Sequence, residues 1–82
     1  MKWFYVCYDL DRPGRNYPNL WNALDSLGAK RVQDSVWLIT RGSGTAKDLA
    51  ANLRKHIDGN DRLVVIESAD SAWYNLMVSP AA

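Results

Sequence analysis

The chain has 82 residues, 10 basic and 9 acidic side chains, a formal net charge of +1 and a single cysteine, Cys7. This length fits one domain, a lone cysteine excludes an intrachain disulfide and a cysteine-based zinc site, and the near-neutral charge argues against a strongly basic nucleic-acid clamp. No apolar run approaches the roughly 20 residues of a membrane-spanning helix, so we expect a soluble cytoplasmic protein with no membrane partner.

The first element is an aromatic and β-branched run over residues 2–10, which is typical of a central strand buried on both faces. Residues 12–15 read Arg-Pro-Gly-Arg, and Pro followed by Gly suits a type II turn. A helix is predicted from Asn16, with Pro18 in its first turn, to Leu27, because its apolar residues share one face and Gly28 follows as a stop.

Residues 29–41 are rich in β-forming residues but too long for one ordinary strand. The polar residues 33–35 in the middle indicate a tight turn, which predicts two strands over residues 30–34 and 36–41. The alternative is one continuous strand across the whole stretch. That reading would give a small parallel βαβαβ sheet.

The second half begins with residues 42–44, a Gly-Ser-Gly connector, and with Thr45 and Asp48 spaced as a helix capping box. An amphipathic helix follows to Ile57, and residues 62–67 predict another buried strand. Residues 72–77 could be strand or helix. The order strand, helix, two strands, helix, strand predicts one α+β domain over residues 1–82, a ferredoxin-like βαββαβ sandwich with a four-stranded antiparallel sheet and two helices on one face. Its core would be residues 2–67 and its C-terminal extension residues 68–82.

Two carboxylates, Asp9 and Asp11, stand at the end of the first strand. In extended chain both point to one side, and magnesium binds few carboxylates and many waters, so one such aspartate from each chain of a dimer could hold the ion. The competing interpretation is ordinary turn chemistry, with Asp11 paired to Arg12 or Arg15. An isolated pair of this kind favours that second interpretation.

Basic and aromatic residues are the other candidates for binding. Strand ends cluster in this fold, so a phosphate track could be lined by basic side chains at those ends: Arg12, Arg15, Lys30, Arg31 and Arg41. A solvated surface interleaved with acidic residues is the favoured interpretation of these side chains. Trp73 and Tyr74 in the extension are the best candidates for covering the sheet edge of a partner subunit.

Short motifs spread over nearly the whole chain resemble a known family. They are YDL at 8–10, RVQDSVW at 31–37 and LVVI at 63–66 after an acidic turn, with NYP at 16–18 and AW at 72–73. The first three resemble the CRISPR-associated Cas2 family and its VapD-like relatives. The last two, with the Asp34-Ser35-x-Trp37 step, are most similar to small stand-alone SinR-like proteins.

The resemblance implies a ferredoxin-like subunit that forms a homodimer. In Cas2 and VapD-like proteins the aspartate closing the first strand is implicated in magnesium-dependent phosphodiester cleavage, and that position is Asp9 here. Cas2 proteins also serve, without cleavage, as the central dimer of the CRISPR integrase. The short connector at 42–44 and the lack of a clear fifth strand after Glu67 depart from the family and weaken the integrase role.

Two functions are therefore expected in competition. The first is a dimeric module that binds RNA, DNA or a protein partner without catalysis, which the near-neutral charge and the few general bases favour slightly. The second is a magnesium-dependent endoribonuclease or endonuclease with Asp9 as its catalytic and metal-binding residue, Asp11 being the further metal candidate. Either function could serve adaptation in a CRISPR system or a toxin–antitoxin pair.

Overall fold

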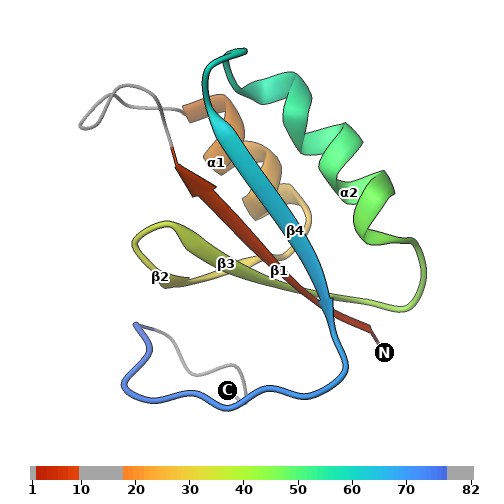
Figure 1. The fold of residues 1–82 in the computed structure, drawn as a ribbon, viewed down its shortest axis with the longest axis vertical. Coiled ribbons are helices and arrows are strands. Elements are labelled where there is room, and N and C mark those ends of the chain that lie inside the picture. Colours follow the sequence, from red (N-terminus) through yellow and green to blue (C-terminus); the bar gives the residue numbers. More distant parts are fainter. Residues whose placement is uncertain (1, 10–17, 78–82) are drawn as a thin grey trace.

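The computed structural model describes residues 2–9 and 18–77. Within them lie β1 (Lys2–Asp9), α1 (Pro18–Ser26), β2 (Lys30–Gln33), β3 (Val36–Arg41), α2 (Ala46–Leu53), the 3-10 turn η1 (Arg54–His56) and β4 (Arg62–Ser68). The strands form a four-stranded sheet in the order β2-β3-β1-β4, and every neighbouring pair is antiparallel. Both helices cover one face of this sheet (Figure 1). The predicted ferredoxin-like α+β sandwich is confirmed.

The stretch 29–41 contains two strands, and the parallel alternative is wrong. β2 pairs with β3 in antiparallel register, with Arg31 opposite Trp37 and Gln33 opposite Val36. Asp34 and Ser35 form the turn between them. These residues interrupt the apolar run with side chains that favour turns, so the chain reverses there instead of continuing as one strand. β2 ends one residue earlier than predicted, and a register shift lies between Arg31 and Gln33.

The core lies between the helical layer and one face of the sheet. Phe4, Val6 and Tyr8 of β1 are buried there against apolar residues of both helices, Leu20, Leu24, Leu49 and Leu53. β1 is central, as predicted, but it is not buried on both faces. Its other side chains, Trp3, Tyr5 and Cys7, are only half-buried, because no helix covers the opposite side of the sheet, which we call the open face.

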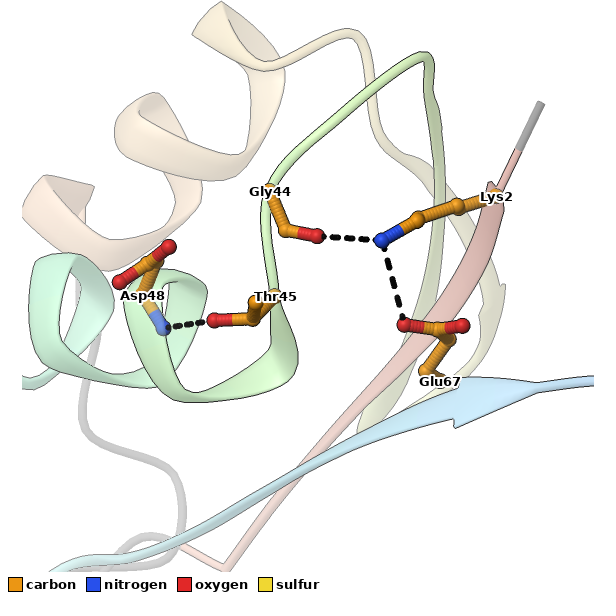
Figure 2. A network of polar contacts seen from close by, with 5 residues as sticks. All are labelled: Lys2, Gly44, Thr45, Asp48 and Glu67. Atoms are coloured by element: carbon orange, nitrogen blue, oxygen red, sulfur yellow. Dashed lines mark hydrogen bonds and ion pairs between the residues drawn. The ribbon is translucent and has the colours of Figure 1, made fainter.

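A polar network ties three elements together at the N-terminal end of β1 (Figure 2). The Lys2 Nζ donates to the Gly44 carbonyl at 2.9 Å and lies 3.8 Å from the Glu67 carboxylate, so it joins β1 to the β3–α2 connection and to β4. Beside it the Thr45 hydroxyl accepts the Asp48 amide N–H at 3.1 Å, which confirms Thr45 as the predicted helix cap. Gly44 has φ +99°, a conformation that favours glycine.

Residues 69–77, which we call the tail, are neither strand nor helix. They run across the side of the sheet opposite the helices (Figure 1). The Trp73 ring stacks on Trp3 with centroids 5.7 Å apart, and its Nε1 donates to the Tyr5 hydroxyl at 2.8 Å. The Met77 amide donates to the Val32 carbonyl of the edge strand β2 at 3.0 Å. The tail is therefore fastened to its own sheet at two separate places.

Neither helix found in the described part of the chain is long and apolar enough to cross a membrane.

Candidate functional site at the end of the first strand

Asp9 closes β1 and lies opposite Arg62, the first residue of β4. The Arg62 Nη1 donates to the Asp9 Oδ2 at 2.9 Å. The side chains of Asp9 and Arg62 are 69% and 81% exposed, and an ion pair this accessible contributes no more than about 1 kcal/mol to stability. Asp9 is thus an accessible carboxylate with a cation already against it. Arg62 was not predicted as a site residue, although antiparallel pairing of the first and last strands would have placed it there.

The described residues of one chain do not by themselves make a magnesium site at this point. Within residues 2–9 and 18–77, no three His, Cys, Asp or Glu side chains lie close enough to hold a metal ion together. Asp9 offers one carboxylate next to a guanidinium, and Asp11 lies outside the described residues. Magnesium can be held by one or two carboxylates and several waters, so a site on Asp9 would take its second carboxylate from Asp11 or from Asp9 of a second chain. The metal roles of Asp9 and Asp11 stay predictions.

Tyr8, the neighbour of Asp9, points to the helical side and connects four elements through one hydroxyl. That hydroxyl accepts hydrogen bonds from the Trp21 Nε1 at 3.2 Å and the Trp37 Nε1 at 3.1 Å, and donates to the Asp34 carbonyl at 3.2 Å. The Tyr8 amide also donates to the Ser35 carbonyl at 3.1 Å. Consequently β1, α1, β3 and the β2–β3 turn are held at the same end of the sheet as Asp9.

Arg31 is held at this end by the same carbonyl. Its Nε and Nη2 donate to the Asp34 carbonyl at 3.0 and 2.7 Å, and its guanidinium lies over the Trp21 ring, 5.5 Å from the centroid. A guanidinium has five N–H donors, so its other donors can bind an anion while these two hold the plane in place. Among the predicted basic residues that the structure describes, Arg31 is held by its hydrogen bonds at the Asp9 end.

The described basic residues among the predicted set do not all lie at one end of the sheet. Lys30 is on β2 next to Arg31, but Arg41 lies opposite Lys2 at the far end of the sheet, with its guanidinium next to Gly44. Arg12 and Arg15 lie outside the described residues. The described strand ends therefore do not form the single track of Lys30, Arg31 and Arg41 that strand-end clustering suggested.

The open face has a covered half and an uncovered half. The tail covers the half over β2 and β3, where Leu38 is buried. Over the edge strand β4, Val64 is 53% exposed and Ile66 is 49% exposed. The prediction of a buried strand over residues 62–67 is wrong: no residue of β4 is buried, because β4 is an edge strand and no described element covers its open face. Cys7 lies between Val64 and Val36 on this face, and its partial burial raises the pKa of the thiol from the ordinary 9.0. Val64 and Ile66 are thus exposed β-branched side chains on the same face of an edge strand.

Trp73 and Tyr74 differ in their surroundings. Trp73 packs on the open face of its own chain, whereas the Tyr74 side chain is 92% exposed. Their role against a partner subunit stays a prediction.

This architecture defines a small ferredoxin-like α+β protein with an accessible carboxylate closing its first strand. The family model for CRISPR associated protein Cas2 matches residues 1–75. The chain belongs to the Cas2 family. Its assignment to the SinR-like or VapD-like relatives stays a prediction.

Proposed function

We propose that this chain is a homodimeric Cas2-family module that binds nucleic acid without cleaving it. The observation that carries this proposal is the Arg62–Asp9 ion pair at 2.9 Å. A guanidinium against the carboxylate repels a divalent cation from that oxygen. Metal binding would have to displace the guanidinium first, which lowers the affinity for the metal. The same guanidinium, with that of Arg31, supplies positive charge to phosphate groups at this end of the sheet.

The exposed apolar side chains of β4 support the dimer. Val64 and Ile66 lie on an edge strand of a small domain, where a second copy could bury them. Trp73 and Tyr74 would lie near the partner's sheet edge in such an arrangement. Size-exclusion chromatography with light scattering should show a dimer that Ile66→Asp shifts to monomer. Ala51→Asp, an equally charged change on the exposed side of α2, should leave the dimer intact.

Nucleic-acid binding is tested by titrating labelled single-stranded RNA and DNA at several salt concentrations. Binding through phosphates must weaken as salt rises, and Arg31→Ala or Arg62→Ala should reduce both the affinity and the slope of that dependence. Lys55→Ala, which removes an exposed cation from η1, is the matched control. Failure to bind either nucleic acid at low salt would leave a protein partner as the ligand.

Magnesium-dependent cleavage is the second candidate, because Asp9 is exposed and occupies the family position. RNA and DNA would be incubated with magnesium, with EDTA, and with Asp9→Asn. The proposal of a non-cleaving module expects no magnesium-dependent products. Cleavage by the unaltered protein that disappears with Asp9→Asn would overturn it. In that case Arg62→Gln should increase cleavage at limiting magnesium, because it frees the carboxylate.

A further inference from the structure

A hollow of about 280 Å³ lies between the tail and the open face of the sheet. The sheet contributes Tyr5, Val32, Gln33 and Val36 to its lining, and the tail contributes Ser71, Ala72, Trp73, Tyr74 and Leu76. Pockets for small organic ligands begin at about 300 Å³, so this hollow suits one flat ring system and little more. We propose that it binds a single unpaired nucleobase. This inference rests on the proposed binding of nucleic acid and adds its recognition site.

The lining combines aromatic rings with a polar edge. Tyr5, Trp73 and Tyr74 surround the hollow, and the 92% exposed Tyr74 ring is free to lie over a bound base. Aromatic side chains stack on every base, since each base has a π face. This part of the site recognises the class of ligand without distinguishing one base from another.

Two polar groups in the hollow can reach the edge of a base. The exposed Gln33 amide offers one acceptor and two donors, which match the adjacent donor and acceptor atoms on a base edge. The Tyr5 hydroxyl accepts from the Trp73 Nε1 at 2.8 Å, which leaves its own proton for an acceptor atom of the ligand. An apolar peptide side chain would use neither group.

Arg31 is near the hollow along β2 but on the other side of the sheet. It is two residues from Gln33, roughly 6–7 Å away along the backbone, and its guanidinium lies over Trp21 of α1. Because β2 is an edge strand, a nucleic-acid strand with one base in the hollow would pass around that edge to bring a phosphate to Arg31. The walls are already in place, because the Trp3–Trp73 stack and the Met77–Val32 hydrogen bond fix the tail on both sides of the hollow. The site also leaves Val64 and Ile66 on β4 free for a second copy.

The test is a fluorescence titration of the full chain, following Trp73 and its neighbours, with three probes: a short single-stranded RNA, the same strand carrying abasic sites, and a free mononucleotide. Intact RNA should bind more tightly than abasic RNA. Gln33→Ala and Tyr74→Ala should each weaken binding of intact RNA about fivefold or more, without changing binding of the abasic strand. Both side chains are exposed, so the folded structure should survive. Asn52→Ala, which removes an exposed amide from α2, should bind like the unaltered chain.

The outcomes separate the two proposals. Equal binding of intact RNA by the unaltered chain, Gln33→Ala and Tyr74→Ala, or equal binding of intact and abasic strands, overturns the base site and leaves nucleic-acid binding standing. Binding of the mononucleotide alone, sensitive to the same two variants, supports the base site and overturns the proposed nucleic-acid function. No binding of any probe overturns both.

Discussion

The indole of Trp73 lies nearly parallel to that of Trp3, with ring planes 11° apart and centroids 5.7 Å apart. The two residues come from opposite ends of the chain, and their stack holds the tail on a sheet face that no helix covers. Trp73 also lines the hollow that Gln33 borders from the sheet. The tail thus replaces a missing layer over half of the open face.

Trp73→Ala should release the tail. It removes an aromatic stack and the hydrogen bond to Tyr5, which together correspond to about 1–3 kcal/mol of unfolding free energy. Urea denaturation should report that loss, and near-ultraviolet circular dichroism should lose the signal of the coupled indoles. Tyr74→Ala, at a 92% exposed position, should change the free energy of unfolding by less than about 0.5 kcal/mol. Equal effects from the two variants would contradict the stack as the fastening point.

Tyr8→Phe should lower the free energy of unfolding by more than the loss of a single hydrogen bond would. The Tyr8 hydroxyl accepts from the indoles of Trp21 and Trp37, and Phe leaves both N–H groups without that acceptor. A buried N–H group that loses its acceptor lowers the free energy of unfolding by about 1–3 kcal/mol. Because Trp21 is only half-buried, its share is smaller, and we expect a total loss of about 2–4 kcal/mol.

Tyr5→Phe is the matched control for that measurement by urea denaturation. Its hydroxyl accepts a single bond, from the exposed Trp73. The expected loss is about 1 kcal/mol or less. If Tyr5→Phe proved as costly as Tyr8→Phe, the hydroxyl of Tyr8 would not be the connection that holds this end of the sheet.

Asp9→Asn and Arg62→Ala should leave the fold nearly unchanged. Their ion pair is exposed and open to screening by salt, so each substitution should cost less than about 1 kcal/mol. Thermal unfolding at low and high salt measures this, and the difference between variant and unaltered chain should shrink as salt rises. Changes in binding or cleavage caused by these variants can then be assigned to the site. A loss of several kcal/mol would show instead that the pair is structural.

The Cys7 thiol should react slowly with alkylating reagents at neutral pH. Burial raises its pKa above 9.0, so the folded chain holds less thiolate than the unfolded chain at a given alkaline pH. Its contribution to stability is complete below the unfolded value, near 9.0, and is lost as pH rises through the higher folded value.

The stability difference between the unaltered chain and Cys7→Ala, measured by urea denaturation, should therefore fall across that alkaline range. Because both proteins share every other titrating group, the difference isolates the thiol. A difference that rises with pH, or a rate of alkylation equal to that of the urea-unfolded chain, would contradict the assigned burial.

Local pattern was sufficient for the order of elements. The polar break at Asp34 and Ser35, the Thr45 cap and the apolar runs at β1 and β4 each act through nearest neighbours, so the ferredoxin-like topology could be predicted from the sequence. The burial of β4 could not, because its place at the edge of the sheet leaves it without a buried residue. Apolar side chains at helical spacing predicted a second helix to Ile57, which is too long. The helix α2 ends at Leu53, and the chain continues as a 3-10 turn. Side-chain spacing does not report where the backbone changes from one helical hydrogen-bonding pattern to the other.

The sequence by itself determined that this is an α+β domain and that an aspartate closes its first strand, because hydrophobic period and turn chemistry are properties of neighbouring residues. Only the tertiary structure decided that Arg62 meets Asp9, that Tyr8 joins Trp21 to Trp37, and that Trp73 returns to Trp3. Those contacts join residues far apart in the chain. Strand register and packing determine them, and the pattern along the chain does not specify either.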